Sequence, residues 1–483
     1  MSLFFCAILV QKSAKKLPME KSKLVQLLRS YASPEIRDFR RYLDSPYFNR
    51  RAEVLSLFDW LARYLKSGKP VPEKEVAYAA VFPSDPFDDH RLRMLMSQLY
   101  QLAGQFLAVQ DFLADEPQTL LRLGQVFRRR KLPSQFAQSA TELAQQLESQ
   151  PFRNADFFQK KYLASLENYR NAFDSRTVDS SHLAHLSGEL DTSFLAQKLW
   201  QACLLHSHEA VSNTSYDSGL LPEALLFAER SGALETPVIA IYYHCYRALT
   251  NPESPQFFQT FKALVLANGR LFPAEEMRDL YILAINFCIR RYNAGSQEFL
   301  RDQFDFYKDG LRQGYFLTDG ELSRYTYQNA VTSGLVMREF DWVEHFIHDY
   351  RDKLAGPYRE SVFSFNLARL AYEKKQYDKA LPLLQLAEYK DLLLNLAAKT
   401  LQLKIYFELD EFDLLEAHLS AFKTFLLRKK ELGYHRENYL NTIQFTRKLL
   451  EINPFDKEAR AALREEIAAA KNLGEKEWLL GEV

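Results

Sequence analysis

The chain of 483 residues is poor in glycine and in cysteine. Its 16 glycines are about half the usual share, which argues against glycine-rich phosphate loops and many tight β-turns. No stretch reaches about 18 uninterrupted apolar residues, so we predict no transmembrane helix. The four cysteines are scattered without a Cys-x-x-Cys pair, a distribution typical of a reduced, intracellular protein. We therefore expect a cytoplasmic location.

Short motifs of the common enzyme classes are also missing. The sequence contains no G-x-S-x-G, no G-x-x-x-x-G-K-[ST], no H-E-x-x-H and no G-x-G-x-x-G. Asp88 and Asp89 form half of the carboxylate set that a metal-diphosphate site needs, but the second cluster is absent. Capping of a helix N-terminus explains this pair better. We predict that the protein is not an enzyme and has no cofactor.

Soft metal ligands are concentrated between residues 182 and 245. They are His182-x-x-His185, His206-x-His208 and His244-Cys245. Nothing in their spacing fixes a tetrahedral geometry, and paired cysteine anchors are absent. We therefore predict no metal site. A metal or ligand found in this region would instead favour a helical enzyme, and we keep this as an alternative functional hypothesis.

Charge is unevenly distributed, although the net charge of the chain is zero. Residues 1–135 contain 22 Lys and Arg against 14 Asp and Glu, a net charge of +8, and the rest carries −8 (40 against 48). The basic run Arg128-Arg129-Arg130-Lys131 has two explanations. It could bind the phosphates of a nucleic acid or another polyanion. Alternatively, it complements the dipole at the C-terminal end of a helix.

The first ten residues are mostly apolar and lack the positive charge with which a secretory signal begins, and three lysines follow them. This pattern makes a poor secretory signal and is too short for a membrane span. A clean amphipathic pattern begins at Met19, which could be the true start. We interpret residues 1–18 as a disordered extension, and a weak signal or anchor is the alternative.

Apolar residues recur at helical spacing through most of the chain. Leu92, Leu95 and Leu99, for example, share one face of a long predicted helix that ends before Asp115. No alternation typical of strands and bounded by Asn-Gly or Asp-Gly is found. These patterns predict an all-α fold.

A repeat is visible in the last third of the chain. Phe340, Tyr377 and Phe412 are each followed directly by an aspartate, and we call this pair of residues an aromatic-acidic step. The three aromatic residues lie 37 and 35 residues apart. This period is close to the ~34 residues of a two-helix unit. Each predicted helix has one apolar stripe, which only a stacked neighbour can bury.

The segment from Asn366 to Ala387 resembles the tetratricopeptide repeats. Ala368, Ala380 and Ala387 stand where that family has small residues, and Tyr377 stands where it has an aromatic residue. The neighbouring units depart from the pattern at the equivalent small positions, with Val331, Val343 and Tyr350 in one and Leu403, Leu415 and Phe422 in the other. The resemblance is good over 365–387, fair over 325–426 and only architectural upstream.

This resemblance implies an α-solenoid, a right-handed superhelix of antiparallel helix pairs that follows an N-terminal helical domain. The predicted segments are a disordered extension (1–18), a basic N-terminal helical domain (19–135), a divergent helical-pair region (136–320), repeats like those of the tetratricopeptide family (321–450) and a C-terminal capping helix (451–483).

A helical repeat array usually offers a surface for partners, so we predict a non-catalytic scaffold or adaptor that binds a protein or peptide. The resemblance implies that the first helix of each unit lines a concave groove. The corresponding positions are Tyr325, Gln328 and Leu335, then Phe365, Arg369 and Tyr372, then Thr400, Lys404 and Phe407. Aromatics with interspersed cations suit an extended peptide with acidic and apolar groups.

Two alternatives to this interpretation stay open. The aromatics could instead pack against further helices. A regulatory nucleic-acid-associated protein that uses its basic N-terminal domain is the second functional hypothesis. The carboxylate clamp of chaperone-binding members is absent, because Asn366 matches it and Gln328, Thr332, Ala397 and Leu401 do not.

Overall fold

The computed structural model describes residues 19–178, 180–212, 214–386, 391–429 and 435–483. Residues 1–18 and Ala387 lie outside these ranges, so the predictions made for them stay untested. Helices account for most of the described residues, which confirms the all-α prediction. Within the described ranges, none of the helices combines the length and the apolar character that a membrane crossing requires.

The chain forms two compact units. Of the described residues, unit 1 contains those of 19–150 and 156–194, and unit 2 contains those of 151–155 and 195–483. The predicted border at residue 135 falls in the first turn of the helix Pro133–Ser149, which packs on the preceding helix inside unit 1. The predicted ranges 19–135 and 136–320 therefore do not coincide with the two units, whereas 321–450 lies wholly in unit 2.

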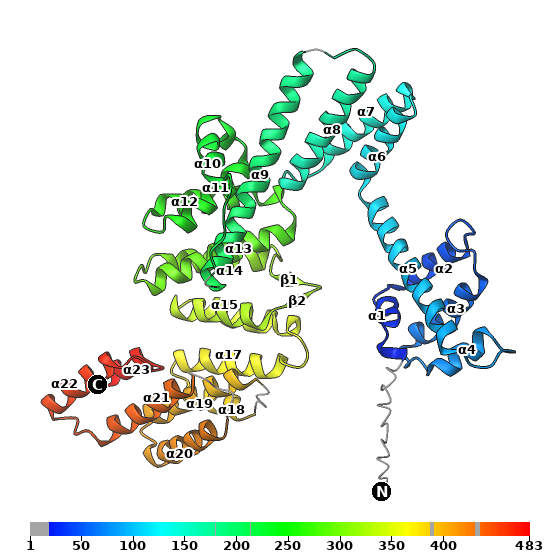
Figure 1. Ribbon diagram of the computed structural model, residues 1–483. Helices are drawn as coiled ribbons and strands as arrows, with labels where there is room; N and C mark the ends of the chain where they lie inside the picture. Colours follow the sequence, from blue (N-terminus) through cyan, green and yellow to red (C-terminus); the bar gives the residue numbers. More distant parts are fainter. Residues whose placement is uncertain (1–18, 179, 213, 387–390, 430–434) are drawn as a thin grey trace, which may run out of the picture. The chain divides into compact units, whose positions relative to one another are not determined.

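Unit 1 consists of α1 to α8 and the first part of α9 (Figure 1). Its helices are α1 (Lys23–Arg29), α2 (Ser33–Asp44), α3 (Ala52–Ser67), α4 (Lys74–Val81), α5 (Asp89–Ala114), α6 (Glu116–Arg129), α7 (Pro133–Ser149), α8 (Ala155–Asp174) and α9 (Ser180–Ser212). The Asp88 carboxylate accepts hydrogen bonds from the first amides of α5, so this residue caps the helix. The core contains Phe39, whose ring centroid lies 5.0 Å from Phe58 and 5.2 Å from Phe106.

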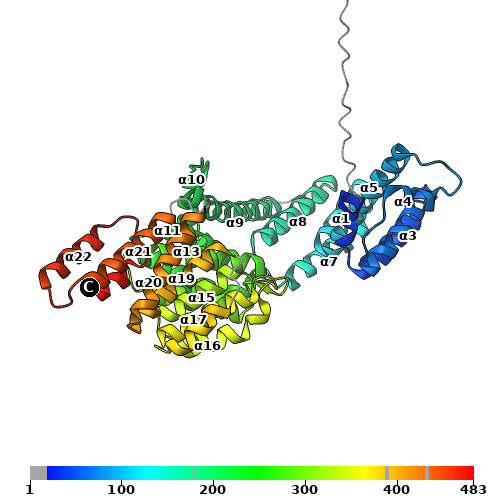
Figure 2. The same cartoon turned by 90° about the horizontal axis from the view of Figure 1, so that it is seen from below.

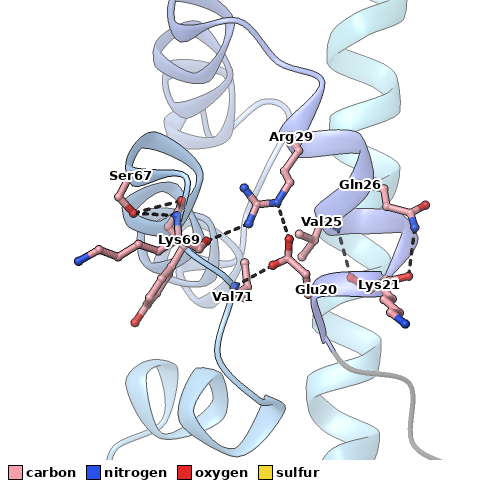
Figure 3. A network of polar contacts seen from close by, with 10 residues as sticks. Glu20, Lys21, Val25, Gln26, Arg29, Ser67, Lys69 and Val71 are labelled. Carbon is pink, nitrogen blue, oxygen red and sulfur yellow. Dashed lines mark hydrogen bonds and ion pairs between the residues drawn. The ribbon is translucent and has the colours of Figure 1, made fainter. Parts of the chain in front are cut away.

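A polar network attaches the first described residues to unit 1 (Figure 3). Glu20 forms an ion pair with Arg29 (2.6 Å) and accepts a hydrogen bond from the backbone amide of Val71 (2.7 Å). Arg29 also donates to the carbonyl oxygen of Lys69 (2.9 Å). Met19 is buried next to this network. Residues 19–21, a short 3-10 helix, are thereby fixed to the segment that joins α3 and α4.

Unit 2 contains helices that pack as consecutive pairs. They are α10 (Leu221–Arg230), α11 (Pro237–Thr250), α12 (Pro255–Asn268), α13 (Ala274–Asn293), α14 (Phe299–Arg312), α15 (Arg324–Val336), α16 (Phe340–Asp349), α17 (Arg359–Glu373), α18 (Tyr377–Leu386), α19 (Leu392–Glu408), α20 (Phe412–Arg428) and α21 (His435–Glu451). The pairs are α11 with α12, α13 with α14, α15 with α16, α17 with α18 and α19 with α20. The first helices of successive pairs also touch, because α17 contacts both α15 and α19 (Figure 1).

The turns inside the last three pairs have one geometry. Arg338, Lys375 and Asp410 are left-handed, with φ of 58°, 55° and 55°. In each turn the next amide donates to a carbonyl five residues earlier, from Glu339 to Gly334 (2.9 Å), from Gln376 to Ala371 (2.8 Å) and from Glu411 to Tyr406 (3.0 Å). This is the helix-ending motif that usually carries glycine. The spacing of 37 and 35 residues therefore marks packed helix pairs, as a helical repeat requires.

A small hairpin corrects one sequence prediction. Strands β1 (Leu317–Thr318) and β2 (Glu321–Leu322) pair antiparallel around Asp319-Gly320. Both turn residues have positive φ, at 51° and 81°, as this type of two-residue turn requires. The two strands are only two residues long, so the sequence around Asp319-Gly320 shows no alternation of apolar and polar residues that would have predicted them.

The C-terminal region is the second correction. The predicted single capping helix over 451–483 is interrupted, and α22 (Lys457–Ala469) is followed by α23 (Lys476–Glu482). Both lie beside α21 at the end of unit 2 (Figures 1 and 2). Glu475 has a left-handed backbone (φ 53°), which lets the chain turn back. Leu479 of α23 then covers Leu463 and Ile467 of α22, an apolar stripe that one helix alone would leave in water.

Candidate functional site

A cavity of about 560 Å³ lies against the first helices of the last three pairs. Its wall comes from α15, α17 and α19, with Tyr439 of α21 and Glu475 from the turn before α23. The wall includes seven residues of the predicted groove, namely Tyr325, Gln328, Phe365, Arg369, Tyr372, Thr400 and Lys404. The structure therefore brings these seven residues together, while their role in binding stays a prediction.

The other two predicted groove residues do not line the cavity. Leu335 is only 4% exposed and belongs to the core. Phe407 is half-buried, with its ring centroid 5.4 Å from that of Trp478 in α23. For Phe407 the alternative interpretation is correct, because a further helix covers this aromatic ring.

One end of the cavity contains a neutralised arginine. Arg324 forms an ion pair with Asp391 (2.9 Å) and donates to the hydroxyl of Tyr325 (2.9 Å). Its guanidinium carbon also lies 4.3 Å from the ring centroid of Tyr358. The same Asp391 side chain caps α19 by accepting from the amide of Leu394 (3.0 Å). Arg324 thus links the start of α15 to the start of α19.

The opposite end contains a neutralised lysine. Lys404 forms an ion pair with Glu475 (3.0 Å), and its nitrogen lies 5.2 Å from the ring of Tyr372 and 5.6 Å from that of Trp478. Sequence analysis missed Glu475 and Trp478, because they follow α22 and belong to no repeat. The apolar Trp478-Leu-Leu run after Gly474 was the available signal of a segment that packs back on the body.

Arg369 lies between these ends on α17. Its Nη1 atom donates to Thr332 Oγ1 (3.0 Å) and to Asn366 Oδ1 (3.5 Å), which are both neutral acceptors. The guanidinium carbon is 5.8 Å from the ring centroid of Phe365. Burial lowers the pKa of Arg369, and the charges of Glu373 and Glu475 partly offset this effect. The group nevertheless stays protonated at neutral pH, since arginine titrates so far above it.

Two other polar groups of the wall are already hydrogen-bonded. The Thr400 hydroxyl donates to the carbonyl of Leu396 (3.0 Å). Tyr372 donates to Glu408 (3.5 Å), and burial raises the pKa of its phenol, so the ring stays neutral. The cavity therefore offers aromatic surface, amides and one cation without a counterion.

A second cavity, of about 740 Å³, lies along α12, α13 and α14. Four of its five charged side chains form ion pairs within the protein, and the fifth, Arg270, is exposed. Lys262 contacts Asp305 (2.9 Å), and Tyr281 donates to Asp309 (2.5 Å), which also pairs with Arg312. The ion pair between Lys262 and Asp305 links α12 to α14, and few polar groups are left to orient a ligand.

The basic run of unit 1 is only partly exposed to solvent. Arg128 forms ion pairs with Glu167 (3.0 Å) and Asp174 (3.0 Å), and its side chain is largely buried. Arg129 donates to the carbonyl of Gln125 (3.2 Å) at the end of α6. Arg128 thus attaches α6 to α8, and the nucleic-acid hypothesis depends on the rest of the run.

The histidine and cysteine cluster of residues 182–245 has ordinary contacts. His206 hydrogen-bonds to the carbonyl of Leu249 (3.2 Å), and His208 to the hydroxyl of Tyr216 (2.9 Å). Cys203 and Cys245 are buried free thiols, as is Cys288. In the described part of the chain, His, Cys, Asp and Glu form no group of three or more that could hold a metal ion. The predicted lack of a metal stays a prediction.

Comparison with known proteins adds no relative. No protein-family model matches this chain, and neither the curated proteins nor the solved structures contain a significant match to it.

Proposed function

We propose that the protein is a non-catalytic adaptor that binds an extended segment of a partner protein in the cavity along α15, α17 and α19. The cavity wall carries the proposal, because the first helices of three consecutive pairs contribute to one concave surface. In a right-handed superhelix similar to tetratricopeptide repeats, the first helices would line the groove in this way. A volume of about 560 Å³ falls in the range of ligand pockets.

The chemistry of the wall supports a peptide as the ligand. Exposed Tyr325 and half-buried Tyr372 offer rigid aromatic surface, which binds apolar side chains at a low entropic cost. Side-chain amides such as Gln328 suit the backbone of an extended chain. Free, buried thiols in unit 2 support a reducing compartment, and we propose the cytoplasm.

A blocking substitution tests the proposal. Ala397 of α19 lines the cavity, and Ala397→Trp should fill it without removing any core side chain. The matched control is Ala417→Trp, at an exposed position of α20. Random peptides displayed on phage would be selected against the full-length protein and then measured by fluorescence polarisation. We expect Ala397→Trp to abolish binding and Ala417→Trp to preserve it. Selected peptides that bind both variants equally would refute the proposal.

A further inference from the structure

Three cations line the cavity, and two of them are neutralised within the protein. Arg324 is paired with Asp391 and Lys404 with Glu475. Arg369 differs, because both of its hydrogen-bond partners are neutral. Among the residues that the structure describes, no carboxylate oxygen lies within 4.0 Å of its guanidinium nitrogens.

An uncompensated and partly buried charge favours an anionic ligand. Removing a cation from water costs free energy, which a carboxylate at hydrogen-bond distance offsets. The guanidinium has five N–H donors in a planar fork, and these two hydrogen bonds of Arg369 both use Nη1. The remaining donors match the two oxygens of a carboxylate. Glu373 lines the same cavity one helical turn away, but it is exposed and stays beyond ion-pair distance.

We propose that Arg369 binds the side-chain carboxylate of an Asp or Glu within the bound segment, and this inference rests on the proposed function. An internal side chain is favoured over a C-terminal carboxylate by the position of Arg369. The cavity continues past it in both directions, toward Arg324 and Tyr325 and toward Lys404 and Glu475. A peptide that crosses the cavity therefore has chain on both sides of the group that meets Arg369.

Three pools of fluorescent decapeptides would test this assignment on the full-length protein. The first has a fixed central Glu, random uncharged residues elsewhere and an amidated C-terminus. The second has Gln in place of Glu. The third has the central Gln and a free C-terminal carboxylate. We expect the first pool to bind about 10- to 100-fold more tightly than the second, as a charge-assisted hydrogen bond should provide.

Charge variants locate the effect. Arg369→Gln should remove the preference for the Glu pool. Arg369→Lys, which keeps the charge and loses the fork, should retain part of it. Glu373→Gln should strengthen binding of the Glu pool by removing a competing negative charge. The control is the double variant Arg447→Gln/Glu416→Gln, which removes an ion pair outside the cavity and should leave the preference unchanged. Circular dichroism would verify that each variant is folded. If Arg369→Gln does not fold, the preference for the Glu pool is measured with Arg369→Lys instead.

The outcomes separate this inference from the proposed function. If the Glu and Gln pools bind equally and Ala397→Trp abolishes both, the role of Arg369 is refuted, while the proposed binding of peptides in the cavity still holds. Preference for the free-carboxylate pool that depends on Arg369 would mean that the protein binds a peptide C-terminus, which also overturns the inference. If no pool binds the wild-type protein, both the inference and the proposed function fail.

Discussion

Gly334 is the position where the packing of one helix pair can be tested most directly. It lies in α15, and a Cβ atom added there would be 2.4 Å from Cγ2 of Val343 in α16. The same atom would be 3.3 Å from the side chains of Phe304 and Trp342. Val343 is fully buried, so its methyl group has no free space to enter.

Two opposing effects determine the stability of Gly334→Ala. Alanine is a better helix former than glycine by about 1 kcal/mol. Overpacking of a closed core costs about 1–3 kcal/mol. Ordinary contact begins near 3.4 Å, so α15 and α16 would have to separate by about 1 Å. We expect the packing term to dominate, with a net loss of about 1–2 kcal/mol in the free energy of unfolding.

Urea unfolding of the full-length protein would measure this loss. The two compact units can unfold in separate transitions, so the change is read from the transition of unit 2, which contains Trp342. Trp342 is a local probe, since its ring stacks on Phe346 at 5.1 Å. Gly104→Ala in α5 is the matched control, because nothing lies within 4 Å of its added Cβ, and its effect is read from the transition of unit 1, which contains Trp60. That control should gain about 0.5–1 kcal/mol.

A double-mutant cycle identifies the contact responsible. Val343→Ala removes the methyl group that clashes, so Gly334→Ala should be much less harmful in that background. If Gly334→Ala stabilises the protein as much as Gly104→Ala does, α15 and α16 do not approach each other as closely at Gly334 as we describe. If Val343→Ala brings no relief, the cost arises from another neighbour.

Three further predictions concern the repeat and the N-terminal network. Ala380→Leu should cost about 1–3 kcal/mol in urea unfolding because Ala380 is fully buried, whereas exposed Ala417→Leu should stay within about 0.5 kcal/mol. Lys375→Gly should raise the unfolding free energy by up to about 1 kcal/mol, since glycine adopts a positive φ without strain; a loss would mean that the turn is not left-handed. The hydrogen bond from Arg29, followed by that from the amide of Val71, lowers the pKa of Glu20 below its ordinary 4.5. Its stabilising contribution is present above that value and is lost as the pH falls through the folded-state pKa, so thermal melts of Glu20→Gln should depend less on pH below about 4.5 than those of wild type.

Most of the packed helix pairs could be predicted because local geometry repeats in the sequence. The aromatic-acidic steps at 340, 377 and 412 each follow a left-handed turn by two residues, so the period in sequence is a period in structure. The cavity residues followed from the same register. Phe365, Arg369 and Tyr372 are spaced i, i+4 and i+7, which places them on one face of α17.

Contacts that do not repeat could not be predicted in this way. Lys404 and Glu475 are 71 residues apart, and no periodic pattern relates them. The interruption between α22 and α23 determines where Glu475 and Trp478 lie, and it depends on one left-handed residue. Leu335 shows a different limit, because its repeat position lines the cavity in α17 but is buried in α15. Repeat position alone does not decide whether a side chain faces the groove or the core.

The charges of the cavity show why this limit matters for function. In the sequence, Arg369 and Lys404 are two similar cations of the predicted groove, and the structure adds Arg324 to the same wall, which together suggest strong attraction for an acidic segment. Their pairing leaves a single cation without a counterion, so electrostatics can contribute at most one strong contact to a ligand. Under the proposed function, aromatic and apolar contacts would then provide most of the affinity, while Arg369 would select among ligands by their charge. The acidic partners of the other two cations come from the loop before α19 and from the C-terminal turn, outside the repeated positions. We therefore propose that the non-repeating segments set the specificity of a surface that the helix pairs build.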